Sequence, residues 1–153
     1  MMTTASEVIA KLSGKTLVTA ESLTGGGIGA ALTAVPGASR VLKGGIISYT
    51  NEVKQKMLGV SAEDLQQYGA VSAPVAIAMA QGARKTLGAD IAVSATGLAG
   101  PDGDEFGHPV GTVFIGYADA EKSLVQECHF SGDREMVRNQ TIEAALSFIL
   151  ANL

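Results

Sequence analysis

Short apolar runs alternate with amphipathic segments along most of this chain, and this alternation limits the folds that are open to it. Buried strands are predicted within residues 15–22, 44–50 and 89–97, because these runs are short, apolar and followed by polar or glycine-containing loops. The helical spacing of apolar residues predicts helices over residues 4–13, 26–35, 51–59, 61–68, 74–87 and 133–150. A chain that alternates in this way is expected to form a layered α/β domain.

Two further strands follow one another directly in the last third of the chain. Residues 111–119 and 123–131 alternate apolar with polar positions and are separated by the turn-like Asp-Ala-Glu-Lys, so a β-hairpin is predicted. The hairpin makes the expected sheet mixed rather than purely parallel. In open α/β sheets, ligands bind at the carboxyl ends of the strands, where most glycine-rich loops of this sequence are expected to lie.

Composition and length favour one globular domain spanning residues 1–153, because 46% apolar and 17% charged residues are enough for a well-filled core. The net charge of −4 argues against a general nucleic-acid-binding face. No apolar run approaches the ~20 residues that cross a bilayer, and the first residues do not resemble a signal peptide. With Cys128 as the single cysteine, these features predict a cytoplasmic protein without membrane attachment.

The stretch Thr-Ala-Glu-Ser-Leu-Thr-Gly-Gly-Gly, residues 19–27, joins the first predicted strand to a helix. Glycines let a ligand approach the backbone, and a helix start offers unpaired N–H groups with a partial positive charge. Such a turn can hold a phosphate or stabilise an oxyanion, and it would expose Ser22 as a nucleophile. On spacing alone, a helix cap formed by Ser22 or Thr24 is the favoured interpretation, because the stretch matches neither a Walker A loop nor a dinucleotide-binding motif.

A second polar cluster contains Ser48, Tyr49, Asn51 and Lys54, where a predicted strand becomes a helix. A serine nucleophile without a histidine needs another base, and a desolvated lysine or a tyrosine can supply one. The alternative interpretation is a solvent-facing lysine beside a packed tyrosine, which composition alone makes the commoner outcome.

The loop over residues 97–111 is long, polar and rich in glycine, as is typical of ligand-binding loops. Thr96 and Gly97 at its start are candidate pocket residues. Four of its side chains are of metal-ligating types: Asp102, Asp104, Glu105 and His108. Their spacing matches neither an EF-hand nor a zinc motif, so we predict no metal and no other cofactor.

Arg134 and Arg138 lie in the first turns of the last predicted helix. Arginines four residues apart share a helix face and can clamp a phosphate, although cations near a helix N-terminus oppose its dipole. A binding role would explain that cost. Pairing of Arg138 with Glu135 or solvent on an ordinary capped helix is the alternative, and the sequence favours neither.

Six blocks occur in order from about residue 17 to residue 146: TAESLTGGGIGAALT, GGIISYTNEVKQKMLGV, YGAVSAPVA, SATGLAGPDG, HPVGTVFIG and FSGDREMVRNQT. Together they resemble the CinA carboxy-terminal domain family, which includes stand-alone nicotinamide-nucleotide amidases. The resemblance implies a three-layer α/β/α domain with a mixed, mostly parallel sheet. It also implies hydrolysis of the carboxamide of nicotinamide mononucleotide to nicotinic acid mononucleotide and ammonia.

The resemblance further implies a nucleophile at Ser22, activated by Tyr49 and Lys54. We expect backbone N–H groups near Thr24 to Gly26 to stabilise the oxyanion, and Arg134, with Arg138 second, to bind the substrate phosphate. The full set of predicted substrate-binding residues is Thr24, Gly25, Gly26, Asn51, Thr96, Gly97, Arg134 and Arg138.

The chain departs from the family pattern at Leu23, where cysteine is usual, at Thr50, where serine is common, and most strongly over residues 102–108. Two alternatives therefore accompany the amidase prediction: a non-catalytic nucleotide-binding paralogue, and an amidase for a different carboxamide. The expected partner is a small nucleotide, with no nucleic acid and no membrane. The apolar helix around Val75–Met79 is compatible both with a homo-oligomer and with a single-chain core.

Overall fold

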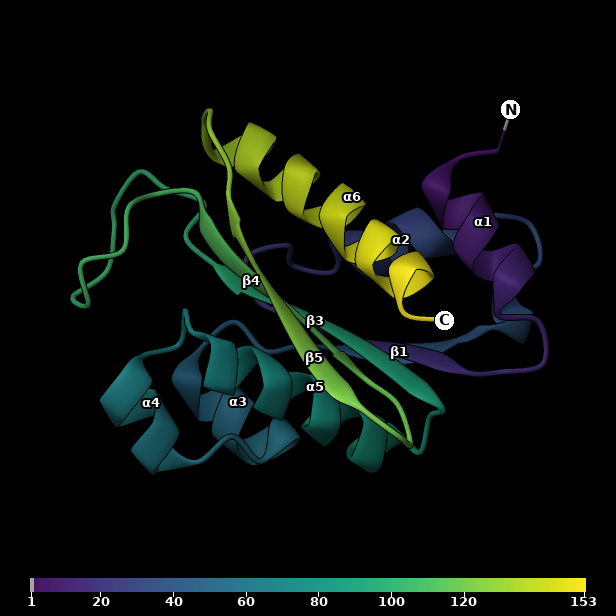
Figure 1. The fold of residues 1–153 in the computed structure, drawn as a ribbon, viewed down its shortest axis with the longest axis horizontal. Coiled ribbons are helices and arrows are strands. Elements are labelled where there is room, and N and C mark those ends of the chain that lie inside the picture. The colour runs from purple at the N-terminus through teal and green to yellow at the C-terminus, as the bar shows by residue number, and fades with distance from the viewer. Residues whose placement is uncertain (1) are drawn as a thin grey trace.

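The computed structural model describes residues 2–153 and forms one five-stranded sheet between two layers of helices (Figure 1). The strands are β1 (Leu17–Glu21), β2 (Leu42–Ile47), β3 (Ile91–Gly97), β4 (Thr112–Ala118) and β5 (Ser123–His129). The helices are α1 (Thr4–Lys11), α2 (Gly27–Thr33), α3 (Asn51–Leu58), α4 (Ala62–Tyr68), α5 (Ala73–Leu87) and α6 (Arg134–Ala151), with a 3-10 turn at Ala38–Arg40. Every predicted strand and helix is present, with ends shifted by a few residues.

The strand order is β2-β1-β3-β4-β5. β1 pairs in parallel with β2 and with β3, whereas β4 is antiparallel to both β3 and β5. Four strands therefore run in one direction and only β4 runs in the other. The predicted mixed, mostly parallel sheet with a late hairpin is confirmed.

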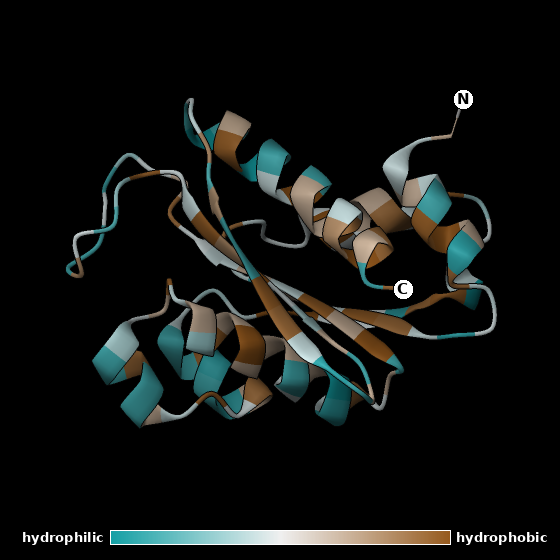
Figure 2. Cartoon of the chain, in the orientation of Figure 1, coloured by the Kyte–Doolittle hydropathy of each residue, from teal (hydrophilic) through white to brown (hydrophobic). Residues whose placement is uncertain are grey.

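Helices α1, α2 and α6 cover one face of the sheet, and α3, α4 and α5 cover the other (Figure 1). Each layer has its own core: Val8, Leu32 and Ile149 are fully buried on the first side. Val75 and Met79 are fully buried on the second, inside the single chain. Figure 2 shows apolar residues along the strands and on the helix sides that face them. The predicted three-layer α/β/α architecture is confirmed.

Local capping signals set the ends of α3, the helix that matters most for the site. The Thr50 side chain accepts a hydrogen bond from the Val53 N–H at the start, and Gly59 ends the helix at φ 69°. A left-handed residue at this position favours glycine, which carries no Cβ. No helix within residues 2–153 is both long and apolar enough to cross a bilayer.

The topology brings the loops after three strands to one edge of the sheet. Because β1, β2 and β3 are parallel, their carboxyl ends lie side by side, and the segments that follow them begin at Ser22, Ser48 and Leu98. The three loops that the sequence predicts to carry polar groups are therefore neighbours in space.

Candidate functional site

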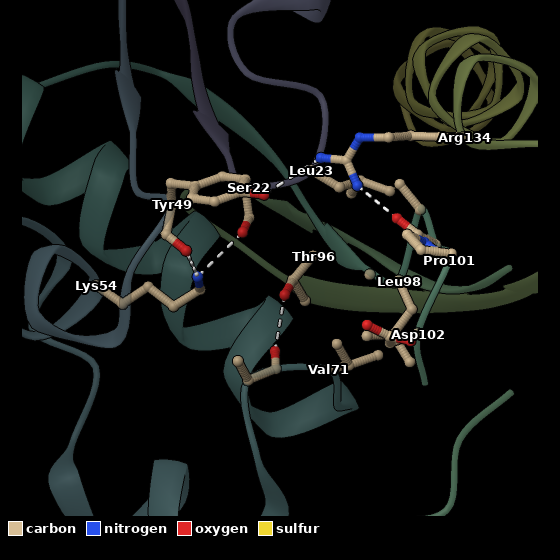
Figure 3. A pocket seen from close by; sticks show the side chains of 14 residues that line it. Ser22, Leu23, Tyr49, Lys54, Val71, Thr96, Leu98, Pro101, Asp102 and Arg134 are labelled. Atoms are coloured by element: carbon tan, nitrogen blue, oxygen red, sulfur yellow. Dashed lines mark hydrogen bonds between the residues drawn. The ribbon is translucent and has the colours of Figure 1, made fainter. Parts of the chain in front are cut away.

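A cavity of about 320 Å³ lies at this edge of the sheet (Figure 3). Residues from all three strand-end loops and from the start of α6 surround it. The lining residues are Ser22, Leu23, Tyr49, Lys54, Ala70, Val71, Thr96, Gly97, Leu98, Ala99, Gly100, Pro101, Asp102 and Arg134. Apolar walls with a few converging polar groups are typical of a small-molecule site.

Ser22 and Lys54 form a direct pair in this cavity. Lys54 Nζ donates a hydrogen bond to Ser22 Oγ at 3.1 Å, and both residues are buried (Figure 3). Nζ also contacts the carbonyl oxygens of Ser48 at 2.8 Å and Tyr49 at 3.3 Å. These three contacts hold the amine against the serine hydroxyl, which is the geometry that a nucleophile and its base require.

The environment of Lys54 favours its neutral form. The side chain is 1% exposed, and desolvation lowers its pKa from 10.5 to about 8. No carboxylate within residues 2–153 forms an ion pair with this amine to stabilise its charge. An amine with a pKa near 8 carries an appreciable neutral fraction near neutral pH, which is what a general base needs.

Glu21 is 2% exposed, and its side chain binds the turn after Ser22 and the start of α2. Its Oε1 accepts hydrogen bonds from the Thr24 hydroxyl at 2.7 Å and from the Ile28 N–H at 2.8 Å. Its Oε2 accepts from the Gly29 N–H at 3.0 Å and from the Thr19 hydroxyl at 3.2 Å. The carboxylate thus caps the N-terminus of α2, a favourable place for a negative charge. Ser22 itself does not serve as this cap.

Tyr49 and Arg134 meet at the mouth of the cavity. Arg134 Nη2 donates to the Tyr49 hydroxyl at 3.3 Å, and Nη1 donates to the Gly100 carbonyl at 2.7 Å (Figure 3). Tyr49 is 59% exposed, and its hydroxyl pairs with Arg134 rather than with Ser22 or Lys54. Arg134 therefore joins the loop after β2 to the loop after β3, and an anionic ligand entering here would meet its guanidinium.

The other predicted site residues fall into two groups. Thr96 and Gly97 line the cavity, with the Thr96 hydroxyl donating to the Ala70 carbonyl at 2.8 Å. Arg138 contacts the backbone of the Ser22 turn, and Asn51 begins α3 as an exposed residue. Within the described part of the chain, the cavity lining does not include this second group, nor the turn residues Thr24, Gly25 and Gly26.

The loop over residues 102–108, which departs from the family pattern, is held by hydrogen bonds between its own residues. Asp104 accepts hydrogen bonds from the His108 N–H at 2.9 Å and from the Phe106 N–H at 3.1 Å, and its Oδ2 lies 2.8 Å from His108 Nδ1. Burial by itself would raise the pKa of the Asp104 carboxyl, but these hydrogen bonds lower it overall. Phe106 packs over Gly69 at the end of α4, where any Cβ would fall 2.6 Å from its ring.

Two carboxylates at the site were not predicted from the sequence as part of it, nor were apolar lining residues such as Val71 and Leu98. Asp102 lines the cavity, whereas the sequence suggested only a metal-ligand type that matched no motif. The motifs give Glu21 no role, although a carboxylate in a fully buried strand must find partners. That mismatch between residue type and strand context is the signal that could have identified it.

The fold and the site define an α/β domain with a buried serine–lysine pair at the carboxyl edge of its sheet. The sequence pattern of the family described as the CinA C-terminal domain matches residues 2–153. A CinA-like protein of Geobacter sp. (strain M21) is 48% identical over 141 residues, which are 92% of this chain and 34% of that protein. The chain thus spans about a third of the length of the curated relatives it matches.

Solved structures agree with this sequence match. The crystal structure of the competence/damage inducible protein CihA from Agrobacterium tumefaciens has a TM-score of 0.93 at 38% identity, covering 97% of this chain and 92% of that one. A CinA superfamily protein from Escherichia coli gives 0.92 at 36% identity, covering 98% of this chain and 88% of that one. The chain belongs to the CinA C-terminal domain family.

Proposed function

We propose that this chain is an amidohydrolase that cleaves the carboxamide of nicotinamide mononucleotide, giving nicotinic acid mononucleotide and ammonia. One observation carries the proposal: a serine hydroxyl lies 3.1 Å from a buried lysine amine whose pKa is lowered to about 8. The names of the relatives state no substrate, so the choice of substrate rests on the family resemblance of the motifs. Arg134 at the cavity mouth supports a phosphate-bearing substrate.

The reaction proceeds by acyl transfer to Ser22. Neutral Lys54 takes the Ser22 proton as Oγ attacks the carboxamide carbon, and backbone N–H groups of the following turn stabilise the oxyanion. When the tetrahedral intermediate collapses, the C–N bond breaks and Lys54 returns the proton to the leaving nitrogen, which departs as ammonia. Water, deprotonated by Lys54, then hydrolyses the ester, so that one amide and one water give one carboxylic acid and one ammonia.

Tyr49 has a different place in this reaction from the one that the motif resemblance implies. Its hydroxyl is hydrogen-bonded to Arg134, and only its backbone carbonyl contacts Lys54. The direct contact between Lys54 and Ser22 provides the proton route without the tyrosine hydroxyl. We assign Tyr49 to the binding of substrate at the entrance, together with Arg134.

The test is ammonia release from nicotinamide mononucleotide by the wild type, by Ser22→Ala and by Ser39→Ala, an exposed serine remote from the cavity. Release by the wild type and Ser39→Ala, with loss in Ser22→Ala, supports the proposal. Failure of the folded wild type to release ammonia contradicts it. In that case a panel of other carboxamides separates an amidase of different specificity from a protein that only binds nucleotides.

A further inference from the structure

The backbone of the turn that follows Ser22 is bound by a side chain more than a hundred residues away in sequence. Arg138, on α6, donates from Nε to the Leu23 carbonyl at 2.9 Å and from Nη2 to the Thr24 carbonyl at 3.2 Å. The planar guanidinium is thus hydrogen-bonded to two successive peptide groups. This contact places Arg138 behind the reacting serine rather than in the cavity.

These two hydrogen bonds determine where the N–H groups of the turn point. In a trans peptide the carbonyl and the N–H point in opposite directions, so a carbonyl held by Arg138 turns the N–H of the next residue away from it. The Leu23 carbonyl therefore fixes the Thr24 N–H. The Ser22 carbonyl, which accepts from the Gly25 N–H at 3.1 Å, fixes the Leu23 N–H in the same manner.

Within the described residues, these two N–H groups have no acceptor. Within residues 2–153, neither the Leu23 nor the Thr24 N–H donates a hydrogen bond, although Leu23 is 4% exposed and Thr24 is 0% exposed. Backbone N–H groups of buried residues that lack a partner are rare in folded proteins. An unused pair directly after a nucleophile is where an oxyanion would find its donors, since the N–H of the residue after the serine has this role in α/β-hydrolases.

We propose that Arg138 is a positioning residue for the oxyanion formed at Ser22. It fixes the Thr24 N–H directly, through the Leu23 carbonyl. It fixes the Leu23 N–H indirectly, because the Thr24 carbonyl that it holds orients the Gly25 N–H, which in turn holds the Ser22 carbonyl. It follows that Arg134 is the arginine that meets the substrate phosphate, and that Arg138 does not contact the substrate. The inference rests on the proposed function for its chemistry, and on the two backbone contacts of Arg138 for its geometry.

The experiment compares Arg138→Lys with Arg134→Lys and with Arg40→Lys, which alters an exposed arginine outside the site. Each variant is assayed on nicotinamide mononucleotide and on the matching nucleoside, nicotinamide riboside, which lacks the phosphate. A lysine cannot hold two carbonyls in a planar fork. Arg138→Lys should therefore lower kcat on both substrates, by up to roughly 10²-fold, with little change in KM. Arg134→Lys should act mainly on KM, and more on the nucleotide than on the nucleoside.

Two results would overturn the inference: unchanged kcat in Arg138→Lys, or a rise in KM confined to the nucleotide, which would make Arg138 a phosphate contact. If the wild type acts on neither substrate, the proposed function fails separately. The geometry is then tested by amide hydrogen exchange followed by NMR. Faster exchange and a shifted resonance at Leu23 and Thr24 in Arg138→Lys, but not in Arg40→Lys, would support the inference, and unchanged amides would refute it.

Discussion

Lys54 Nζ lies 3.1 Å from Ser22 Oγ, although 32 positions separate the two residues in the sequence. If the amine accepts the serine proton, kcat/KM should depend on the neutral fraction of Lys54. Because burial lowers its pKa to about 8, we expect kcat/KM to rise roughly tenfold for each pH unit below 8 and to level off above it. A pH–rate profile between pH 6 and 10 measures this.

The control for that profile is Lys54→Met, which replaces the aliphatic stem by an unbranched apolar side chain of nearly the same length and removes the amine. It should lose roughly 10²- to 10⁴-fold in kcat, the usual contribution of a general base. Lys56→Met changes an exposed lysine two residues away on the same helix and should keep the wild-type profile. A profile that is flat between pH 6 and 8 in the wild type would exclude Lys54 as the base.

The same burial links the pH to folding stability. The folded-state pKa of Lys54, about 8, lies below the unfolded value of 10.5, so the unfolded chain binds more protons between these two values. The Lys54 contribution to the free energy of unfolding is therefore unfavourable at neutral pH, and stability should rise as the pH increases from 8 to 10.5. The full change is on the order of 3 kcal/mol.

Urea unfolding at pH 7, 8.5 and 10 tests this linkage in the wild type and in Lys54→Met. As the pH rises, the free energy of unfolding of the wild type should increase relative to that of Lys54→Met. A difference that stays constant over this range would show that the amine is equally easy to protonate in both states. Lys56→Met again provides the exposed comparison.

Glu21 is expected to matter for both stability and turnover, because all four of its hydrogen-bond partners are donors. Glu21→Gln presents an amide NH₂ to some of those donors, so the turn after Ser22 should loosen. We expect a loss of roughly 2–3 kcal/mol, the usual range for buried hydrogen bonds to a charged group. Glu52→Gln, at an exposed position on α3, should stay within about 0.5 kcal/mol of the wild type.

Thermal unfolding and ammonia release are the two measurements for Glu21→Gln. A variant that melts lower and also loses turnover at a temperature where it is fully folded supports a turn that must be held rigid. Full activity in the folded variant would show that the Ser22 turn does not need this carboxylate.

Much of the fold follows from the sequence, because apolar periodicity and glycine punctuation are local signals. The run within residues 89–97 becomes the central strand β3, and the hairpin of β4 and β5 forms where its turn residues indicate. The meeting of Ser22 with Lys54 was reached through the family resemblance, since spacing alone favoured a helix cap. The cap is in fact Glu21.

The contacts of the arginines could not be predicted in the same way. The two arginines are four residues apart on one helix. Arg134 nevertheless lies at the cavity mouth, whereas Arg138 binds the backbone of the turn after Ser22. Which of two such side chains meets a ligand depends on the crossing of α6 over the Ser22 turn. This crossing is a long-range packing result that periodicity does not encode.

The loop over residues 101–109 provides the last prediction. Asp104 holds it closed through the Phe106 and His108 N–H groups and the His108 ring, and the same loop contributes Asp102 to the cavity. Asp104→Ala removes all of these contacts, so the loop should open and KM should rise several-fold, while kcat at saturation changes little because Ser22 and Lys54 are untouched. Glu105→Ala, an exposed neighbour, is the matched control. Equal kinetics of the two variants would show that the loop takes no part in binding, whereas a fall in kcat alone would place Asp104 closer to the chemistry than its contacts indicate.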